Sequence, residues 1–410
     1  MSTESLLEEI RDHVHSELTT HIIPYWTNKV FDSNTGKFYA RITGNNQVDT
    51  NADHVCILHA RILWFFSSSY RVLQNDSLKP FAESAYNFLS TTLWDEANGG
   101  VYWSVDANEQ PKNTKKHTYG QAFAIYAFAE YARAFNDEEA LEKAKIIFSH
   151  LEKHSFDANS NSYIECFDRN WNPTDDVKLG DSDIQAPRSF NTHLHILEAF
   201  TTLYRIWPNE LLKDRLNGLI DLHLNKIWNE DLNHFLGFFN HDWQAISNTY
   251  SYGHDIEASW LLTEAAKVTG DVLRITKTNS LAVLISSITL EEGLDKQNGG
   301  IFNSGQNGAV LDTDKDWWAQ AEAIVGLVNE FQISGNTENL EYALDIWKFI
   351  SEFILDANYG EWFWKVDFKG NPSFIEDKIG PWKCPYHTGR LCLEIMERVR
   401  DGIPVPVISK

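Results

Sequence analysis

The chain has few cysteines, and their spacing is not that of a metal site. Cys56, Cys166, Cys384 and Cys392 are the four cysteines among 410 residues, and no two of them form a ligand pair. A reducing compartment would leave all four as thiols. The sequence also has no phosphate-binding loop, no nucleotide-binding motif and no evident cluster of metal ligands. We therefore predict no metal site.

Further absences bear on location and partners. No apolar stretch reaches the length of a membrane span, and the start Met1-Ser2-Thr3-Glu4 is polar and acidic, unlike a secretion signal. We therefore expect a cytoplasmic protein. The formal charge of −23 argues against nucleic acids and anionic membranes as partners. No Pro-rich or Ser-rich linker divides the chain, so we expect one domain over residues 1–410, and a monomer.

One turn motif recurs six times. In each copy an acidic or amide residue, preceded by an aromatic residue or leucine, opens a turn rich in Asn and Gly. The copies begin at Asp32, Asp95, Asp157, Asn229, Asp295 and Asp356. A fixed period of this kind, about 65 residues here, indicates stacked supersecondary units. Because Asn-Gly supplies the positive φ angles of a tight turn, each copy is predicted to be a short hairpin.

Apolar residues at helical spacing predict two helices per repeat, which makes twelve. In the segment 121–133, for example, Ala122, Ile125, Ala129 and Ala132 recur at three or four residues. The predicted ranges are about 4–29, 53–74, 79–93, 118–136, 138–154, 190–206, 209–227, 253–269, 271–289, 316–334, 338–355 and 386–400.

Six helix pairs must bury their apolar faces against one another, either as an open superhelix or as a closed ring. The aromatic, Gly-rich hairpins and the single compact chain favour the ring, an all-α double toroid. In such a toroid the helix after each hairpin is the inner one, and its N-terminus faces a central funnel. Unusual polar residues lie at these starts: Asp53, His54, Arg61, Tyr119, Gln121, Asn191, His193, His195, His254, Glu257, Trp317, Trp318, Gln320, His387 and Arg390.

Aromatic residues are abundant, with 15 Trp, 24 Phe and 15 Tyr. Most are expected to fill the helical core. Sugar-binding clefts also use aromatic side chains, because the C–H faces of pyranose rings stack on them. Trp317, Trp318 and Trp382 lie at the predicted mouth of the funnel, where we expect them to contact a sugar.

Two pairs at helical spacing are candidates for proton transfer. His254 and Glu257 are three residues apart and share a helix face, where a carboxylate would fix the tautomer of the imidazole and raise its pKa. An ordinary surface helix pair is the alternative. Asn191 and His195, four residues apart, also share a face, and the same two interpretations stay open for them.

Two further groups complete the candidate set. His387 follows a segment made rigid by Pro381 and Pro385, and Arg390 lies one turn later. Arg61 interrupts an otherwise apolar helix, where a buried guanidinium needs a ligand oxygen or a carboxylate. Histidines, an arginine and stacking aromatics suit proton transfer at a carbon beside a carbonyl, through an enediolate. Return of the proton on the opposite face inverts that carbon.

Four longer stretches resemble the cellobiose 2-epimerases of the N-acylglucosamine 2-epimerase superfamily. They are residues 188–195 (RSFNTHLH), 253–260 (GHDIEASW), 316–322 (DWWAQAE) and 380–387 (GPWKCPYH). The resemblance spans essentially the whole chain. It implies an (α/α)6 barrel and reversible, cofactor-independent epimerisation at C2 of the reducing-end sugar of β-1,4-linked disaccharides such as cellobiose and lactose.

The resemblance also implies roles for single residues. His254 and His387 would exchange the C2 proton through a cis-enediolate, with Glu257 supporting His254. His195 would bond near the reducing-end oxygens, and Arg61 would stabilise the enediolate. The implied sugar contacts are Asn191, Tyr119, Trp317, Trp318, Trp382, Phe302 and Gln320. One departure is visible, because Phe302-Asn303-Ser304 stands where the family commonly has Tyr followed by Asn-Glu.

Other functions remain open at this point. Mannobiose 2-epimerase would share the motifs, and N-acylglucosamine 2-epimerase and mannose isomerase belong to the same superfamily. An (α/α)6 glycoside hydrolase needs two opposed carboxylates, for which Asp53, Asp183 and Glu322 are candidates, but the histidines would then have no role. A non-catalytic sugar-binding toroid is the remaining alternative. The preferred non-reducing-end sugar and an accompanying ketose isomerisation are also open.

Overall fold

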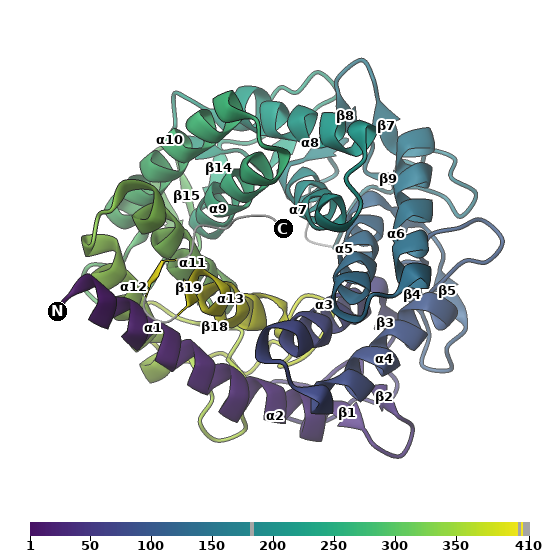
Figure 1. Cartoon of the computed structure of the whole chain (residues 1–410), viewed down its shortest axis with the longest axis horizontal. Helices are drawn as coiled ribbons and strands as arrows, with labels where there is room; N and C mark the ends of the chain where they lie inside the picture. The colour runs from purple at the N-terminus through teal and green to yellow at the C-terminus, as the bar shows by residue number, and fades with distance from the viewer. Residues whose placement is uncertain (181–183, 401–402, 405–410) are drawn as a thin grey trace.

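The helices form two concentric rings (Figure 1). The computed structural model describes residues 1–180, 184–400 and 403–404. The inner ring within them consists of α3 (Cys56–Leu73), α5 (Thr118–Phe135), α7 (Phe190–Ile206), α9 (Tyr252–Thr269), α11 (Trp317–Ser334) and α13 (Pro385–Arg398). The outer ring consists of α1 (Thr3–Glu17) continued by α2 (Ile23–Tyr25), then α4 (Lys79–Asn87), α6 (Glu138–His150), α8 (Glu210–Leu222), α10 (Val272–Ile288) and α12 (Glu338–Phe349). The predicted (α/α)6 barrel is confirmed.

Each outer helix ends in a wider π-helical turn of five residues. These turns are Leu18–Ile22 and Trp26–Val30 in the first outer helix, followed by Phe88–Thr92, Leu151–Ser155, His223–Ile227, Thr289–Gly293 and Ile350–Ile354. Five of the six predicted outer-helix ranges include all or nearly all of these turns, because a single π turn leaves no apolar period of its own, whereas the range 271–289 stops at the first residue of Thr289–Gly293. In every outer helix the last π turn lies just before a hairpin, so the hairpins all lie at one end of the barrel.

The six repeated turns are hairpins, as predicted. Three close with two-residue ladders, namely β1 (Phe31–Asp32) with β2 (Lys37–Phe38), β7 (Phe156–Asp157) with β8 (Ser162–Tyr163) and β11 (Trp228–Asn229) with β12 (His234–Phe235), and the others close with single bridges. In the second copy the Asp95 carboxylate accepts the backbone N–H groups of Ala97 and Asn98 at 3.2 and 3.4 Å. This side-chain bond explains why an acidic or amide residue opens the turn.

Buried lysines fix two of these hairpins to the helices that follow. The Lys116 ammonium lies 3.1 Å from the Asp95 carboxylate, and neither side chain is exposed. Lys315 makes the equivalent contact with Asp295 at 2.8 Å. Each lysine stands just before an inner helix. The ion pair therefore sets the position of the helix start relative to its hairpin.

Most repeats also contain a second tight turn, which was not predicted. These turns cover residues 43–47, 106–110, 168–172, 240–244 and 367–371. In the second, the Asp106 carboxylate accepts the backbone N–H of Gln110 at 2.9 Å, and Glu109 has a φ of 63°. The signal was present in the sequence, because an acidic, amide or hydroxyl residue is followed four residues later by Gln or Asn at the same long period.

Short antiparallel pairs join neighbouring repeats. The strand before an inner helix pairs with the strand after the next hairpin: β3 (His54–Val55) with β4 (Ser104–Val105), β6 (Lys116–His117) with β9 (Cys166–Phe167), β10 (Arg188–Ser189) with β13 (Phe238–Phe239), β14 (Thr249–Ser251) with β15 (Ser304–Gln306), and β17 (Lys315–Asp316) with β18 (Lys365–Val366). The remaining strands are β5 (Pro111–Asn113), β16 (Ala309–Asp312), β19 (Val399–Arg400) and β20 (Ile403–Pro404). A bridge between Ile42 and Ile379 joins the first repeat to the last and closes the ring.

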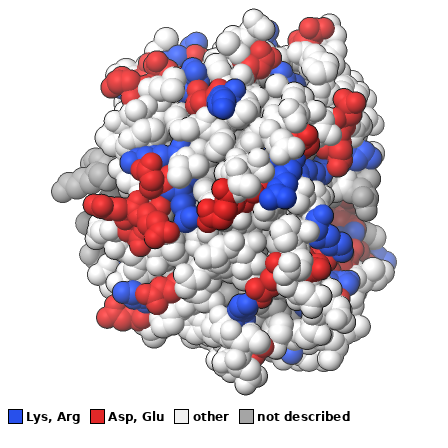
Figure 2. Space-filling model, turned by 90° about the vertical axis from the view of Figure 1, so that its right-hand side faces the viewer, with Lys and Arg blue, Asp and Glu red and all other residues white. Residues whose placement is uncertain are grey.

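The inner helices are buried on nearly all sides, whereas the outer helices are amphipathic. In α5 the residues from Thr118 to Ala132 are all buried, but in α6 the buried residues are only Ala140, Ala144, Ile147 and Phe148. No helix in the described part of the chain combines the length and apolarity of a membrane span. On the face drawn in Figure 2, acidic and basic side chains are interspersed.

Candidate active site

A cavity of about 170 Å³ lies among the N-terminal ends of the inner helices. All six inner helices contribute to it. Its lining consists of Arg61, Tyr119, Asn191, His195, His254, Glu257, Asp316, Trp317, Trp318, Trp364, Trp382 and His387. The fold thus brings ten of the predicted site residues together from positions spread over more than 300 residues of sequence.

His195 and His387 each have a buried carboxylate behind the ring. His195 Nδ1 lies 2.9 Å from Glu198 Oε2, and His387 Nδ1 lies 2.7 Å from Glu322 Oε1. An ionised carboxylate only accepts, so in each pair the Nδ1 atom carries the proton. Nε2 is then the ring nitrogen left to meet a substrate in the cavity. Neither Glu198 nor Glu322 was predicted as the partner of a histidine.

His254 has a different environment. Its ring lies beside those of Trp318 and Phe190, at centroid distances of 4.6 and 5.9 Å. Among the hydrogen bonds of the described residues, none joins His254 to Glu257. Burial lowers the pKa of His254, and the nearby charge of Glu257 opposes that shift. The two side chains share the helix face that their spacing predicts, but the Glu257 carboxylate contacts Arg390 instead.

His254 and His387 are close enough to act on one molecule. Trp318 contacts both rings, at 4.6 Å from His254 and 5.6 Å from His387 between centroids. Since these distances add to 10.2 Å, the two imidazole centroids lie no farther apart than that. Burial lowers the pKa of His387 well below its ordinary value. Both rings are therefore neutral near pH 7 and able to accept a proton.

Arg61 supplies a buried positive charge to the cavity. Its Nη2 donates to the Tyr119 hydroxyl at 3.0 Å. Its guanidinium lies 4.3 Å from the ring centroid of Phe123 and 4.5 Å from that of Tyr386. The expected carboxylate partner is not among these neighbours, because aromatic faces and a phenol surround the guanidinium. A ligand oxygen is the part of the expectation that this arrangement still fits. Among the described residues, no carboxylate is in direct contact with this positive charge, which is available to a developing oxyanion.

Aromatic side chains form one wall of the cavity, and several buried polar atoms on its lining lack a protein partner. Trp317 and Trp364 meet edge to face at 5.0 Å, beside Trp318 and Trp382. Among the described residues, Trp317 Nε1 and Asn191 Oδ1 are buried without a hydrogen-bond partner. A polyhydroxylated ligand would satisfy such groups, because each sugar hydroxyl both donates and accepts.

Two predicted sugar contacts lie outside this lining. The Gln320 amide is occupied by the fifth hairpin, since its oxygen accepts from Ile301 N at 2.6 Å and its nitrogen donates to Ile301 O at 2.9 Å. Gln121 clamps Val101 in the same way. Phe302 lies under the Lys315 ammonium, 5.5 Å from its ring centroid, rather than in the cavity. Conversely, Asp316 and Trp364 line the cavity and were not predicted.

Of the carboxylates considered for a glycoside hydrolase, the two that the structure describes, Asp53 and Glu322, do not form an opposed pair. Asp53 is paired with Lys112 at 2.7 Å outside the cavity lining. Glu322 is buried and accepts the Trp260 N–H at 3.0 Å in addition to its contact with His387. Asp183 lies outside the described residues. The geometry therefore gives no support to hydrolysis by two carboxylates.

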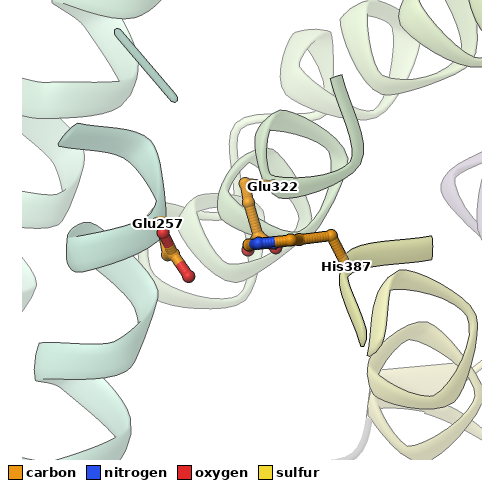
Figure 3. A group of neighbouring side chains, drawn as sticks. All are labelled: Glu257, Glu322 and His387. Carbon is orange, nitrogen blue, oxygen red and sulfur yellow. The ribbon is translucent and has the colours of Figure 1, made fainter. Parts of the chain in front are cut away.

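Glu257, Glu322 and His387 form a cluster whose ligand atoms lie within 4.8 Å of one another (Figure 3). The Arg390 guanidinium contacts Glu257 Oε1 and lies 2.6 Å from Glu322 Oε1. A positive charge is thus already placed between the two carboxylates. A divalent cation would have to share these oxygens with the guanidinium, so the donor set does not fit a metal site.

Comparisons with known proteins identify the family of this chain. The model of the N-acylglucosamine 2-epimerase family matches residues 36–390. The chain belongs to the N-acylglucosamine 2-epimerase family. Cellobiose 2-epimerase of Bacteroides fragilis is 42% identical over 389 residues, which cover 95% of this chain and 99% of the relative. Cellobiose 2-epimerase of Ruminococcus albus is 39% identical over 397 residues, which cover 97% and 100%. The structure of cellobiose 2-epimerase from Bacillus thermoamylovorans has a TM-score of 0.91 at 37% identity, covering 96% of this chain and 100% of that one.

The segment in which this member of the N-acylglucosamine 2-epimerase family departs from the expected pattern lies beside α9. Ser304 pairs with Ser251, and the Ser251 hydroxyl accepts the backbone N–H of His254 at 3.3 Å. The change from a carboxylate to a serine at position 304 therefore falls next to the helix start that carries a candidate catalytic histidine.

Proposed function

We propose that this chain is an epimerase that inverts C2 of the reducing-end glucose or mannose of β-1,4-linked disaccharides, converting cellobiose to glucosyl-mannose and lactose to epilactose. The observation that carries the proposal is the pair of neutral imidazoles, His254 and His387, that line one cavity from two helices. The names of the full-length relatives support the choice of a disaccharide.

The proposed reaction moves one proton at a time. After the reducing-end ring opens, one imidazole removes the proton from C2, and the electron pair of the C–H bond becomes the C1–C2 double bond of an enediolate. The other imidazole, which has first taken a proton on its free ring nitrogen from solvent, then delivers that proton to the opposite face of C2. The carbonyl reforms, and the first imidazolium returns its proton to solvent. Because the two histidines come from α9 and α13, they can approach the carbon from different sides.

Stabilisation of the enediolate falls to the groups that carry positive charge or donate hydrogen bonds. Arg61 provides a buried guanidinium whose closest protein partner is the neutral phenol of Tyr119. Burial raises the pKa of Tyr119 to about 12, so the phenol remains a donor. His195, with its Nδ1 proton committed to Glu198, presents Nε2 as an acceptor for a reducing-end hydroxyl. Preorganised groups of this kind act most strongly in a site closed to water.

Sugar binding is assigned to the remaining lining. Trp317, Trp318 and Trp382 offer flat apolar surfaces for the two pyranose rings, and Asn191 offers an amide. The choice of a disaccharide over a monosaccharide rests on the names of the full-length relatives.

Incubation with cellobiose in deuterated water tests the activity. We expect glucosyl-mannose with deuterium at C2, because the proton returned to C2 comes from a histidine that exchanges with solvent. Release of free glucose would instead indicate a hydrolase, and an unchanged sugar would indicate a binding protein or another substrate. Parallel reactions with mannobiose, mannose and N-acylglucosamine distinguish the related activities.

Substitution of the two histidines tests their roles. His254→Ala and His387→Ala are each expected to lower kcat by about 10²–10⁴-fold, the usual contribution of a general acid or base. Both variants should stay folded by circular dichroism, since both side chains border a cavity. A variant that keeps parental turnover would remove that histidine from the mechanism.

We also infer that residues 1–410 form one catalytic domain that works as a cytoplasmic monomer. The bridge between Ile42 and Ile379 and the hydrogen bond from Trp362 Nε1 to Glu17 at 2.9 Å tie the first repeat to the last. The four cysteines are buried free thiols, which suits a reducing compartment. Light scattering coupled to size-exclusion chromatography tests the monomer, with a mass near 47.1 kDa expected.

A further inference from the structure

Arg390 lies beneath the cavity floor and joins side chains from several inner helices. Its Nη1 donates to Glu198 Oε1 at 2.5 Å and contacts the Tyr386 hydroxyl. Its Nη2 donates to Glu322 Oε1 at 2.6 Å and contacts Glu257 Oε1. The guanidinium is fully buried. One arginine therefore connects α7, α9, α11 and α13 at a single point.

The carboxylates that Arg390 binds are those that contact the site histidines. Glu198 accepts from His195, and Glu322 accepts from His387. Burial alone would raise the pKa of Glu198, but Arg390 together with His195 lowers it to about 2. Without the guanidinium, several buried glutamates would face one another with no compensating charge, which is strongly unfavourable.

We propose that Arg390 is the positioning residue of the active site. It holds Glu198 and Glu322 ionised and in place, and these carboxylates hold His195 and His387 with Nδ1 protonated and Nε2 toward the cavity. The planar shape of the guanidinium matters as much as its charge, because Nη1 donates to a carboxylate on α7 and Nη2 donates to one on α11. The catalytic relevance of this arrangement rests on the proposed epimerase function, but the arrangement itself does not.

The groups that face His387 determine how it titrates. They come from each neighbouring inner helix and are Glu322, Glu257, Arg61, His195 and Arg390. Burial is the main reason for the low pKa of His387, and the positive charge of Arg390 adds to it. Displacement of that charge would raise the pKa of His387. Since a base must be neutral to act, the acid limb of a pH–rate profile would then move to higher pH.

Arg390→Lys is the informative substitution, because lysine keeps the charge and loses the fork. The shorter lysine side chain has one nitrogen in place of the Nη1 and Nη2 atoms that bind Glu198 and Glu322 separately. We expect kcat to fall on the order of 10²-fold through misplacement of the histidines, with little change in KM. We also expect the acid limb of kcat/KM to move to higher pH. A purely structural role would lower the rate equally at all pH values.

Arg398 offers a matched control on the same helix. It is also fully buried, bonds to Glu394 and Asn329, and lies over the ring of Trp260 as Arg390 does. Arg398→Lys should lower thermal stability without moving the pH profile. If both variants shift the profile equally, or if neither does, the positioning role of Arg390 is wrong.

Nitrogen-15 NMR of the histidine side chains tests the arrangement in the unaltered protein, so the test survives if Arg390→Lys does not fold. We expect the proton on Nδ1 in both His195 and His387, with the signals assigned through His195→Asn and His387→Asn. Protons on Nε2 in both rings would overturn the proposal. The NMR measurement does not depend on enzyme activity. If the protein is inactive on every sugar, the proposed function is refuted, and the spectra still decide whether Arg390 positions the histidines.

Discussion

Replacement of Glu322 by glutamine tests whether His387 needs an ionised carboxylate. Glu322 Oε2 accepts the Trp260 N–H at 3.0 Å, and Oε1 meets His387 Nδ1 at 2.7 Å and Arg390 Nη2 at 2.6 Å. Glutamine has the same shape but only one acceptor oxygen. Whichever way the amide is turned, its NH₂ group faces a donor, either Trp260 or Arg390.

The size of the effect follows from these contacts. If the NH₂ group points to His387, Nδ1 must accept and the proton moves to Nε2, where it blocks the base. If the carbonyl points to His387, the tautomer is kept but the imidazolium loses its counter-charge. Carboxylate-to-amide changes behind a catalytic histidine reach about 10⁴-fold in kcat. We expect a loss of about 10²–10⁴-fold here, together with about 1–3 kcal/mol of stability from the opposed donors.

The assay compares two variants by kcat for cellobiose epimerisation and by urea unfolding. Glu17→Gln is the matched control, because Glu17 is also buried between a tryptophan N–H, Trp362 Nε1 at 2.9 Å, and a histidine, His21 Nδ1 at 2.7 Å, but lies outside the cavity. The control should keep its kcat and lose less stability, because the half-exposed His21 ring can present an unprotonated Nδ1 to the amide NH₂ group. Parental kcat in Glu322→Gln would refute the assigned role of the carboxylate.

Two further predictions concern residues that the fold uses structurally. His193 accepts from Tyr163 N at 3.1 Å, and burial lowers its pKa to about 3. The folded state therefore binds fewer protons than the unfolded state between that value and about pH 6.5, so stability due to neutral His193 is lost as pH falls. We expect the free energy of unfolding of His193→Gln, relative to that of the parent, to be about 2 kcal/mol higher at pH 5 than at pH 8. Urea unfolding at both pH values measures this difference, and a difference that does not change with pH would contradict the prediction. Gln320→Leu should lose about 1–3 kcal/mol through the unpaired Ile301 backbone, with KM for cellobiose unchanged. If the variant is as stable as the parent but has a raised KM for cellobiose, Gln320 contacts the sugar after all.

Local sequence was sufficient for the repeat and for the identity of the inner helices. The acidic residue that opens each hairpin binds the amides of its own turn, as Asp95 does, so the turn is specified within a few residues. The helical period is local in the same sense. The second turn at residues 106–110 obeys the same rule, and it escaped prediction only because its motif contains no Asn-Gly pair.

Partners of buried side chains were much harder to predict. Gln320 and Trp317 stand at the start of the same helix, three residues apart, yet the amide clamps a hairpin and the indole lines the cavity. The spacing of His254 and Glu257 predicted a shared face correctly, but the carboxylate contacts Arg390, which is 133 residues away in sequence. Helical spacing shows which side chains are able to meet and leaves open the competing partners from other helices.

The sequence by itself determined the barrel, the end at which its functional groups gather and ten of the twelve residues that line the cavity, because turns and apolar periods act over short distances. Only the tertiary structure decided which carboxylate lies behind which histidine. The pairing depends on where the ends of six helices converge and on how the buried carboxylates are neutralised. Arg390 neutralises Glu198 and Glu322 from another helix, and no spacing in the sequence reveals these contacts.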